Sequence, residues 1–355
     1  MSEKVLMKGN EAIAEAAILA GCRHYFGYPI TPQTEVAAYM SRRMPQIGGC
    51  FLQAESEISA INMVLGVSAA GLRVMTSSSS PGISLKSEGI SYLAGCDLPA
   101  LIVNVQRGGP GLGGIQPSQS DYFQATKGGG HGDFHLLVLA PASVQEMVDL
   151  TVQGFDLADK YRMPVMLLAD GTMGQMMEPV SLDVGRVEQP AKPWAVTGTQ
   201  LKREHNIVNS LFLKPEELEE FNFARYEKYA QIEQNEVRYE EYLMEDAQLC
   251  IVAFGVAARV SKNAIDIARS RGIKVGMIRP ISLWPFPKKV IFDAASRVKA
   301  FISVELSMGQ MIEDIDLAQR CKRPLLLCNR VGGMIPTTEN VLDSIDKAAA
   351  LGGEG

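Results

Sequence analysis

Hydrophobic and polar positions alternate along the chain in a way that predicts strands and helices in turn. Short runs rich in Val, Ile and Phe predict strands, and longer segments with apolar residues three or four positions apart predict helices. After a first helix from Glu11 and the strand behind it, the expected strands are Cys50–Ala54, Arg73–Ser77, Ala100–Val105, Leu136–Ala140 and Pro164–Ala169. Helical segments separate most of them, so we expect an α/β fold with a parallel sheet covered on both faces.

The pattern changes between about Glu178 and Asp246. A proline-punctuated extended segment leads into a charged one that predicts a solvated helix, whose aromatic residues could seat it on another domain or subunit. From Gln248 the alternation resumes, with turns expected at Pro280–Pro287, PISLWPFP. The expected division is a first domain at 1–180, a connector at 181–246 and a smaller second α/β domain at 247–355.

Composition limits the classes of partner. The chain has 355 residues, 46% of them hydrophobic, and a net charge of −6. An acidic chain argues against nucleic acid or an anionic membrane as partner, because both require clustered Lys and Arg. No run approaches the ~18 apolar residues of a membrane span, and charges interrupt the amino-terminal apolar segment. We therefore expect a cytoplasmic protein.

The six cysteines predict no metal site. Only Cys321 and Cys328 lie close in sequence, and there is no C-x-x-C. This spacing can build neither an iron–sulfur site nor a zinc site, so we expect buried, reduced thiols. The four histidines show no H-E-x-x-H pattern, and we expect no catalytic metal bound by this chain alone.

The stretch Arg23–Glu35, RHYFGYPITPQTE, predicts a rigid corner between a strand and a helix. Pro29 and Pro32 fix φ, and the residue before each proline is pushed into an extended conformation. Thr31 is expected to cap a helix whose first position is Pro32. Ligands bind at such strand ends in open α/β sheets, so we expect this corner to lie at a ligand site.

A glycine-rich segment follows the strand at Ala100–Val105. Gly108–Gly114, GGPGLGG, contains a literal G-x-G-x-x-G, the phosphate-binding pattern of nicotinamide-dependent dehydrogenases. The next residues, IQPSQSDYFQ, are polar and include Pro117 where an apolar helix should begin, which favours a flexible active-site loop instead. Arg107 at the base of this loop could bind a carboxylate or form an ion pair at the sheet edge.

Two further segments place polar side chains at expected strand ends. Glu55 and Glu57 stand where a strand turns into an apolar helix, and both could be first-turn acids that complement the helix dipole. Alternatively, Glu57 could be a carboxylate in an apolar pocket, with a raised pKa, that shares a proton with a ligand nitrogen. Thr76–Gly82, TSSSSPG, could receive an anion or a polar ring, or could be a plain helix cap and turn.

In this order, these stretches resemble the α subunit of the 2-oxoacid:ferredoxin oxidoreductases, thiamine-diphosphate enzymes that decarboxylate a 2-oxoacid and form an acyl-CoA. GYPITPQTE is similar to the family's YPITP signature, QAESEISAINMVLGVSAAG to its glutamate helix, TSSSSPGISL to its Ser/Gly turn and VNVQRGGPGLGGIQPSQSD to its arginine–glycine loop. RPISLWPFP and VELSMGQM extend the resemblance over essentially the whole chain. Ser80 stands where the turn usually has glycine.

The resemblance implies a pyrimidine-binding domain for thiamine diphosphate, followed by a transketolase C-terminal-like domain. It implies that Glu57 hydrogen-bonds the aminopyrimidine ring nitrogen and so favours the tautomer that takes the thiazolium proton. Thr31 and Arg107 would bind the 2-oxo and carboxylate groups of the substrate. The further cofactor contacts that it implies are Pro29, Ser79 and Ser80.

The resemblance also implies partners. Thiamine enzymes bind diphosphate through Mg²⁺ on a G-D-G motif followed by an asparagine, and ADGTMG at Ala169–Gly174 has no asparagine at that distance. A β subunit would therefore carry the diphosphate, the Mg²⁺ and a [4Fe–4S] cluster. Small γ and ferredoxin-like δ subunits would complete the complex, with ferredoxin as electron acceptor and coenzyme A as co-substrate.

The expected function is oxidative decarboxylation of a branched-chain 2-oxoacid such as 2-oxoisovalerate, by an enzyme active only with its partner subunit. 2-Oxoglutarate is the alternative substrate. Two alternatives of a different class are a nicotinamide-dependent dehydrogenase and a non-catalytic scaffold subunit.

Overall fold

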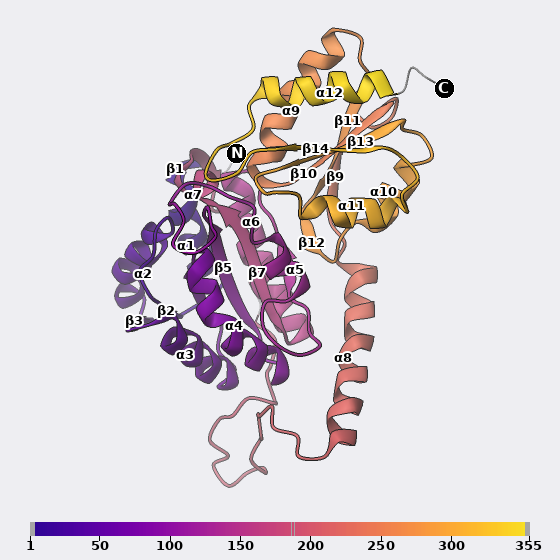
Figure 1. Cartoon of the computed structure of the whole chain (residues 1–355). Coiled ribbons are helices and arrows are strands. Elements are labelled where there is room, and N and C mark those ends of the chain that lie inside the picture. The colour runs from indigo at the N-terminus through magenta and orange to yellow at the C-terminus, as the bar shows by residue number, and fades with distance from the viewer. Residues whose placement is uncertain (1–3, 186, 188, 352–355) are drawn as a thin grey trace.

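The computed structural model describes residues 4–185, 187 and 189–351. Two α/β units follow one another along the chain and are joined by a long connector (Figure 1). Residues 1–3 of the first expected domain and residues 352–355 of the second lie outside the described residues. Within the described ranges, no helix is both long and apolar enough to cross a membrane.

The first unit is built on a seven-stranded sheet. In spatial order its strands are β12 (Ser282–Trp284), β6 (Leu137–Leu139), β7 (Pro164–Asp170), β5 (Ala100–Gln106), β4 (Val74–Ser78), β2 (His24–Gly27) and β3 (Cys50–Gln53). All neighbouring pairs are parallel except β12 with β6. β5 and β7 are buried along their whole length, as expected for strands covered on both faces.

The helices of the first unit pack around this sheet. They are α1 (Gly9–Leu19), α2 (Thr34–Gln46), α3 (Glu57–Ala69), α4 (Ser80–Gly95), α5 (Tyr122–Lys127), α6 (Val144–Tyr161) and α7 (Gly171–Gln175). α1 packs against α2 and α6, α3 packs against α4, and both α4 and α6 contact β5 and β7. The predicted parallel α/β sheet is confirmed. An unpredicted antiparallel pair, β1 (Lys4–Lys8) with β8 (Met177–Ser181), joins the beginning and the end of this unit.

The second unit is built on a five-stranded sheet. In spatial order its strands are β14 (Leu325–Asn329), β13 (Ala300–Glu305), β10 (Leu249–Ala253), β11 (Val275–Pro280) and β9 (Tyr239–Tyr242). Only the pairing of β9 with β11 is antiparallel. Its helices are α9 (Gly255–Ser270), α10 (Lys288–Ala294), α11 (Met311–Gln319) and α12 (Thr338–Leu351). α9 packs against α12 and α10 against α11.

One predicted turn segment is a strand. PISLWPFP was expected to form turns, but β12 lies within it and pairs with β6 of the first sheet, opposite Leu139 and Val138. The prediction failed because prolines flank a segment of only four residues, within which the three of β12 are buried. The second half of the chain therefore contributes an edge strand to the first sheet.

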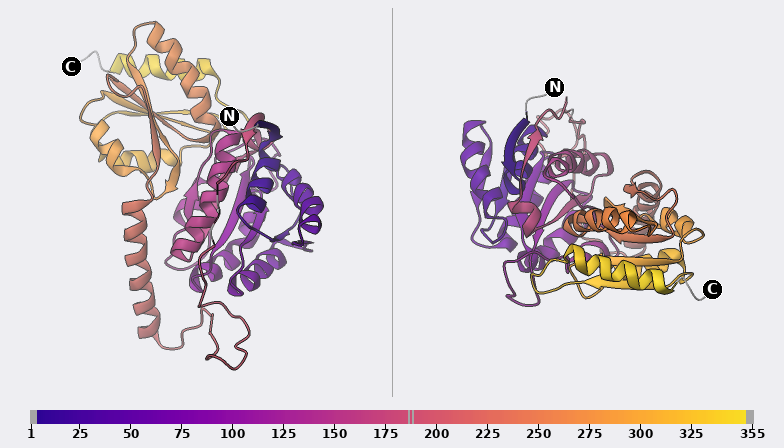
Figure 2. Two further views of the ribbon diagram at one scale, coloured as in Figure 1. Left: turned by 180° about the vertical axis from the view of Figure 1, so that it is seen from behind. Right: turned by 90° about the horizontal axis from the view of Figure 1, so that it is seen from above.

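The connector contains the expected charged helix, α8 (Pro215–Asn235), which runs beside the first unit towards the second (Figures 1 and 2). Tyr229 is 4% exposed, and its hydroxyl accepts a hydrogen bond from the His135 N–H at 3.1 Å. Its ring also lies edge-on to Trp284 of β12. Tyr229 therefore makes the expected aromatic contact between α8 and the first sheet, whereas Phe223 is 66% exposed.

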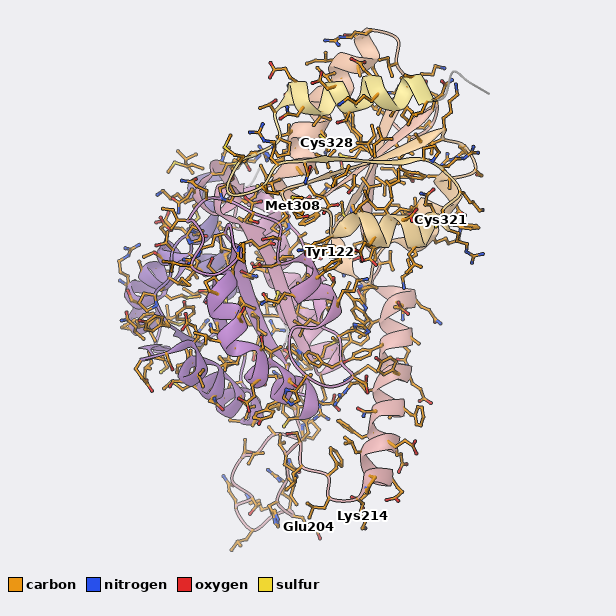
Figure 3. The ribbon with its side chains drawn as sticks, viewed as in Figure 1. Tyr122, Glu204, Lys214, Met308, Cys321 and Cys328 are labelled. Atoms are coloured by element: carbon orange, nitrogen blue, oxygen red, sulfur yellow. The ribbon has the colours of Figure 1, made fainter. Side chains whose placement is uncertain are left out.

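Polar contacts fasten the two units to each other. Gln119 exchanges hydrogen bonds with the backbone of Leu306 and donates from its side chain to the Phe254 carbonyl at 2.9 Å. The Tyr122 hydroxyl donates to Asp314 of α11 at 2.6 Å. Figure 3 shows Tyr122 where the first unit meets the second, with Lys214 at the far end of the connector. The segment after the glycine-rich loop therefore lies at the junction of the two units.

The cysteines only partly match the expectation. All six are free, and Cys22, Cys250 and Cys328 are buried. The prediction of buried thiols is wrong for Cys50, which begins the edge strand β3, and for Cys321, which follows α11 in a left-handed conformation with φ of 52°.

Candidate functional site

The carboxyl ends of neighbouring parallel strands bring the predicted segments to one edge of the first sheet. β4 lies between β2 and β5, and β3 lies on the other side of β2. The corner at residues 28–32 follows β2, Ser79 follows β4, Arg107 follows β5, and Glu57 begins the helix after β3. This is the edge at which open α/β sheets bind ligands.

The corner after β2 differs in detail from the prediction. α2 begins at Thr34 with Gln33 as its N-cap residue, so the prediction that Thr31 caps a helix starting at Pro32 is wrong. The Gln33 N–H instead donates to the Ile30 carbonyl at 3.2 Å, which closes a separate turn before the helix. Thr31 is exposed, and among the described residues its hydroxyl has no hydrogen-bond partner.

A buried polar chain fixes the corner to β4. The Gln33 side-chain oxygen accepts a hydrogen bond from the Ser77 hydroxyl at 2.5 Å. That hydroxyl also lies 2.7 Å from the Tyr25 hydroxyl of β2. All three side chains are fully buried, so the corner has little freedom to move relative to the strand ends.

Arg107 is brought directly to the corner. Its Nη1 donates to the Thr31 carbonyl at 2.9 Å and its Nη2 to the Leu112 carbonyl at 3.2 Å. The residue is 7% exposed, and its Nε is buried without a partner. Within the described part of the chain no carboxylate pairs with it, so the alternative of an ion pair at the sheet edge is wrong.

The structure distinguishes the two glutamates. Glu55 is exposed and accepts a hydrogen bond from the Ser59 hydroxyl at 2.5 Å. Glu57 is 5% exposed, and its carboxylate accepts no hydrogen bond from any described residue. Ser56 already caps α3 by accepting from the Ser59 N–H. Glu57 is therefore the buried member of the pair, and the described residues leave its carboxylate without a hydrogen bond.

The serine turn lies against this carboxylate. The Ser78 and Ser79 hydroxyls are buried without a partner, and Ser79 makes no side-chain cap on α4. A Cβ on Gly82 would lie 2.1 Å from the Ser78 Oγ and 2.6 Å from the Glu57 Oε1. Glycine at this position thus lets two polar groups meet over the first turn of α4, and a plain cap does not account for Ser79.

Ser80 has a structural role within the turn. Its hydroxyl donates to the Asp121 Oδ2 at 2.6 Å and accepts from the Arg107 N–H at 3.0 Å. Asn104 donates to the same Asp121 oxygen at 2.9 Å. Burial raises the pKa of Asp121. Asn104 and Asp121 were not predicted from the sequence, although an amide within the apolar β5 was a signal for such a network.

Lys86 was also missed. It is fully buried in α4, and its ammonium donates to the Thr76 Oγ1 at 2.7 Å and to the Ser77 carbonyl at 3.1 Å. Burial lowers the pKa of Lys86 to about 7, and the charge of Glu57 acts in the opposite direction. A lone lysine in the otherwise small and apolar helix face was the available signal.

The glycine-rich loop forms no dinucleotide site. The Gly114 N–H donates to the Gly108 carbonyl at 2.8 Å, and the next helix begins only at Tyr122. A helix N-terminus directly after the glycines, which a pyrophosphate would need, is therefore missing here. Instead the loop borders a cavity of about 530 Å³ between the two units. Residues that line it include Ser80, Gly109, Asp121, Leu306, Met308 and Gln310.

Two family models match this chain, one over each unit. The model of the pyruvate flavodoxin/ferredoxin oxidoreductase thiamine-diphosphate-binding domain matches residues 15–242, more than half of the chain. The chain belongs to this oxidoreductase family. The core domain II model of pyruvate:ferredoxin oxidoreductase matches residues 247–341.

Relatives within the oxidoreductase family are similar over nearly the whole chain. The ketoisovalerate oxidoreductase subunit VorB of Methanothermobacter marburgensis is 55% identical over 97% of both chains. The 2-oxoglutarate synthase subunit KorA of Methanothermobacter thermautotrophicus is 34% identical over 98% of this chain and 99% of its own.

Solved structures agree with the family assignment. The 2-oxoglutarate:ferredoxin oxidoreductase of Magnetococcus marinus, with 2-oxoglutarate, coenzyme A and succinyl-CoA bound, superposes with a TM-score of 0.83 at 28% identity. The match covers 98% of this chain and 65% of that longer chain. A split-gene transketolase, an inactive β4 tetramer, superposes with a TM-score of 0.62 at 13% identity, which shows a shared fold alone.

Proposed function

We propose that this chain is the α subunit of a thiamine-diphosphate-dependent 2-oxoacid:ferredoxin oxidoreductase that acts on branched-chain 2-oxoacids such as 2-oxoisovalerate. The observation that carries the proposal is the buried Glu57 carboxylate, which accepts no hydrogen bond from a described residue and lies at Gly82 beside the Ser78 hydroxyl, which also lacks a partner. The branched-chain substrate is supported by 55% identity to a ketoisovalerate oxidoreductase subunit, against 34% to a 2-oxoglutarate synthase subunit.

The site residues fit an aminopyrimidine ring. Glu57 can hydrogen-bond the ring nitrogen, and the buried hydroxyls of Ser78 and Ser79 lack partners that an amino group could supply. Pro29, exposed at the same sheet edge, is proposed to contact the cofactor, and Ser80 to fix the turn through Asp121. When bound, thiamine diphosphate supplies the carbanion-stabilising thiazolium that decarboxylation of a 2-oxoacid requires.

Arg107 and Thr31 are proposed to bind the substrate. The unpartnered Nε of Arg107 and its uncompensated charge suit the substrate carboxylate, since a guanidinium forms charge-assisted hydrogen bonds with it. The free hydroxyl of Thr31 suits the 2-oxo oxygen. Because Arg107 also donates to the Thr31 carbonyl, the two groups keep a fixed spacing that would orient the carboxylate for loss of CO2.

The chain is proposed to be active only with a partner. Asp170 of the ADGTMG segment caps α7 through its Oδ1, which accepts from the Thr172 and Met173 N–H groups at 2.9 and 3.1 Å, and its carboxylate also accepts from the Val256 backbone. It is therefore a poor ligand for the Mg²⁺ of a diphosphate. A β subunit would bind the diphosphate, Mg²⁺ and a [4Fe–4S] cluster, and γ and δ subunits, ferredoxin and coenzyme A would complete the reaction.

A panel of 2-oxoacids tests the proposal. The complex co-purified with this chain is assayed for reduction of a low-potential acceptor with coenzyme A. We expect thiamine-diphosphate-dependent turnover with the highest kcat/KM for 2-oxoisovalerate. A preference for 2-oxoglutarate would overturn the substrate class, and acceptor reduction that needs NAD(P) in place of thiamine diphosphate would overturn the enzyme class.

A further inference from the structure

We propose that Lys86 is a positioning residue for Glu57. Its buried ammonium supplies the positive charge that stabilises the Glu57 carboxylate, so that a proton shared with a ligand ring nitrogen moves onto the nitrogen. The inference rests on the proposed function for the identity of that ligand. The coupling of the two side chains is a property of the chain itself and can be measured without turnover.

The helix geometry points Lys86 at Glu57. Gly82 and Lys86 are four residues apart on α4 and so lie on the same face of the helix. Helical side chains lean towards the N-terminus, which directs Lys86 back over the turn of Gly82. The Glu57 Oε1 lies directly above that turn, 2.6 Å from where a Gly82 Cβ would stand.

The hydrogen bonds of Lys86 do not neutralise the charge of its ammonium. Both acceptors, the Thr76 hydroxyl and the Ser77 carbonyl, are uncharged, and no carboxylate of the described chain lies within ion-pair distance. A buried ammonium with neutral partners is costly and stabilises any nearby anion strongly, since the medium around it screens little.

Glu57 is the charged group that acts on Lys86. On α4 itself Glu88 is exposed and accepts a hydrogen bond from Tyr92. The packed strands β5 and β7 carry no charged side chain along their length except Asp170 at the end of β7, and Asp170 is turned into the cap of α7. Burial brings the pKa of Lys86 to about 7, with the Glu57 charge opposing the shift.

The first test compares Lys86 variants in the assembled complex. Single-turnover decarboxylation is followed across neutral pH for wild type, Lys86→Met, Lys86→Gln and Lys86→Arg. We expect the wild-type rate to fall as pH rises through about 7, where Lys86 loses its proton. Both neutral variants should be slower by about 10-fold or more without this transition, and Lys86→Arg should keep the rate and lose the transition, because arginine stays charged.

A purely structural lysine would behave differently. The neutral variants would then lose activity equally at every pH and retain the wild-type transition, which would overturn the proposal. Glu88→Gln, which removes an exposed charge from the same helix, is the matched control and should leave the profile unchanged.

The second test needs no turnover and covers the case that neutral variants fold poorly. Between about 7 and 10.5 the unfolded chain binds a proton that folded Lys86 has released, so this residue makes stability rise with pH over that window. The lower edge of this window is the pKa of folded Lys86, which the negative charge of Glu57 raises. In Glu57→Gln that charge is gone, so thermal midpoints of the complex, measured across pH, should begin to rise at a lower pH than in wild type. An unmoved window would show that the two groups are uncoupled and would overturn the inference, whatever the substrate.

Discussion

At the scale of single residues, two backbone carbonyls hold the Arg107 guanidinium at the site and leave its charge without an anionic partner among the described residues. Glu57 is buried, and no described residue donates a hydrogen bond to it. Such groups destabilise an empty site and favour the binding of a ligand that pairs with them.

Replacing Arg107 should weaken use of the oxoacid. For Arg107→Lys, which keeps the charge but cannot bind a carboxylate through two parallel hydrogen bonds, we expect KM to rise about 10-fold, and for Arg107→Met about 100-fold. Thiamine diphosphate affinity, measured by calorimetry on the complex, should stay unchanged. Loss of cofactor affinity with an unchanged KM would assign Arg107 to the cofactor instead.

Replacing the Thr31 hydroxyl tests the other substrate contact. Thr31→Val keeps the shape of the side chain and removes the hydroxyl, so we expect kcat/KM for the oxoacid to fall about 10-fold. Thr31→Ser retains the hydroxyl and is the matched control, with near-normal kinetics. A loss in Thr31→Ser with near-normal kinetics in Thr31→Val would indicate that the methyl group, and not the hydroxyl, matters.

At the scale of elements, close packing of α3 against α4 makes the polar pocket. Gly82 is the position that decides the approach, because any side chain there collides with Ser78 and Glu57. Glu57 begins the helix after β3, whereas the serine turn with Gly82 follows β4, and the order of strands in the sheet brings these two segments to one edge.

Gly82→Ala should weaken cofactor binding while the chain still folds. The added Cβ would lie 2.6 Å from the Glu57 Oε1, so the carboxylate must move away. We expect the Kd of thiamine diphosphate to rise by about 10-fold or more, since a buried hydrogen bond to a charged group is lost. The matched control is Gly66→Ala in α3, where nothing lies within 4 Å of the new Cβ. That variant should be stabilised by about 0.5–1 kcal/mol and bind normally, and equal binding losses in both would contradict the pocket.

The strand and helix pattern predicted most of the first sheet because buried parallel strands such as β5 and β7 are continuous apolar runs. It did not predict β12, since Pro280 and Pro285 around Leu283 indicate turns and the partner strand β6 lies far away in sequence.

The cap at Thr31 was misplaced because a turn and a helix start share the same residue types. Lys86 and Asp121 were missed, as burial of a charged residue depends on neighbours that only the fold supplies. The proposed boundaries at 180 and 246 follow the change of pattern along the chain.

At the scale of the whole molecule, the two units meet through buried polar groups that include Asp170. Burial raises the pKa of Asp170 from its ordinary 3.8 to about 6, although its backbone hydrogen bonds, one of them from Val256 of the second unit, oppose the shift. Between those values the folded chain binds the extra proton, so the contribution of Asp170 to stability is present at low pH and is lost as pH rises through about 6.

Asp170→Asn should therefore flatten the pH dependence of stability. We expect the thermal midpoint of wild type minus that of Asp170→Asn to decrease as pH rises from about 4 to about 6, because wild type loses the stabilising proton over this range. Asp149→Asn, at an exposed position on α6, is the control and should run parallel to wild type. A difference between wild type and Asp170→Asn that does not vary with pH would contradict the burial of this carboxyl.

The whole chain is thus proposed to supply one face of a thiamine diphosphate site that a partner subunit completes. The most direct test is reconstitution from the separately purified α chain and partner, followed by 2-oxoisovalerate-dependent acceptor reduction with coenzyme A. Neither component alone should react, the mixture should react, and Glu57→Gln should assemble normally yet lower the rate by about 100-fold or more. Near-normal turnover by the assembled Glu57→Gln complex, or full activity of this chain alone, would contradict the account.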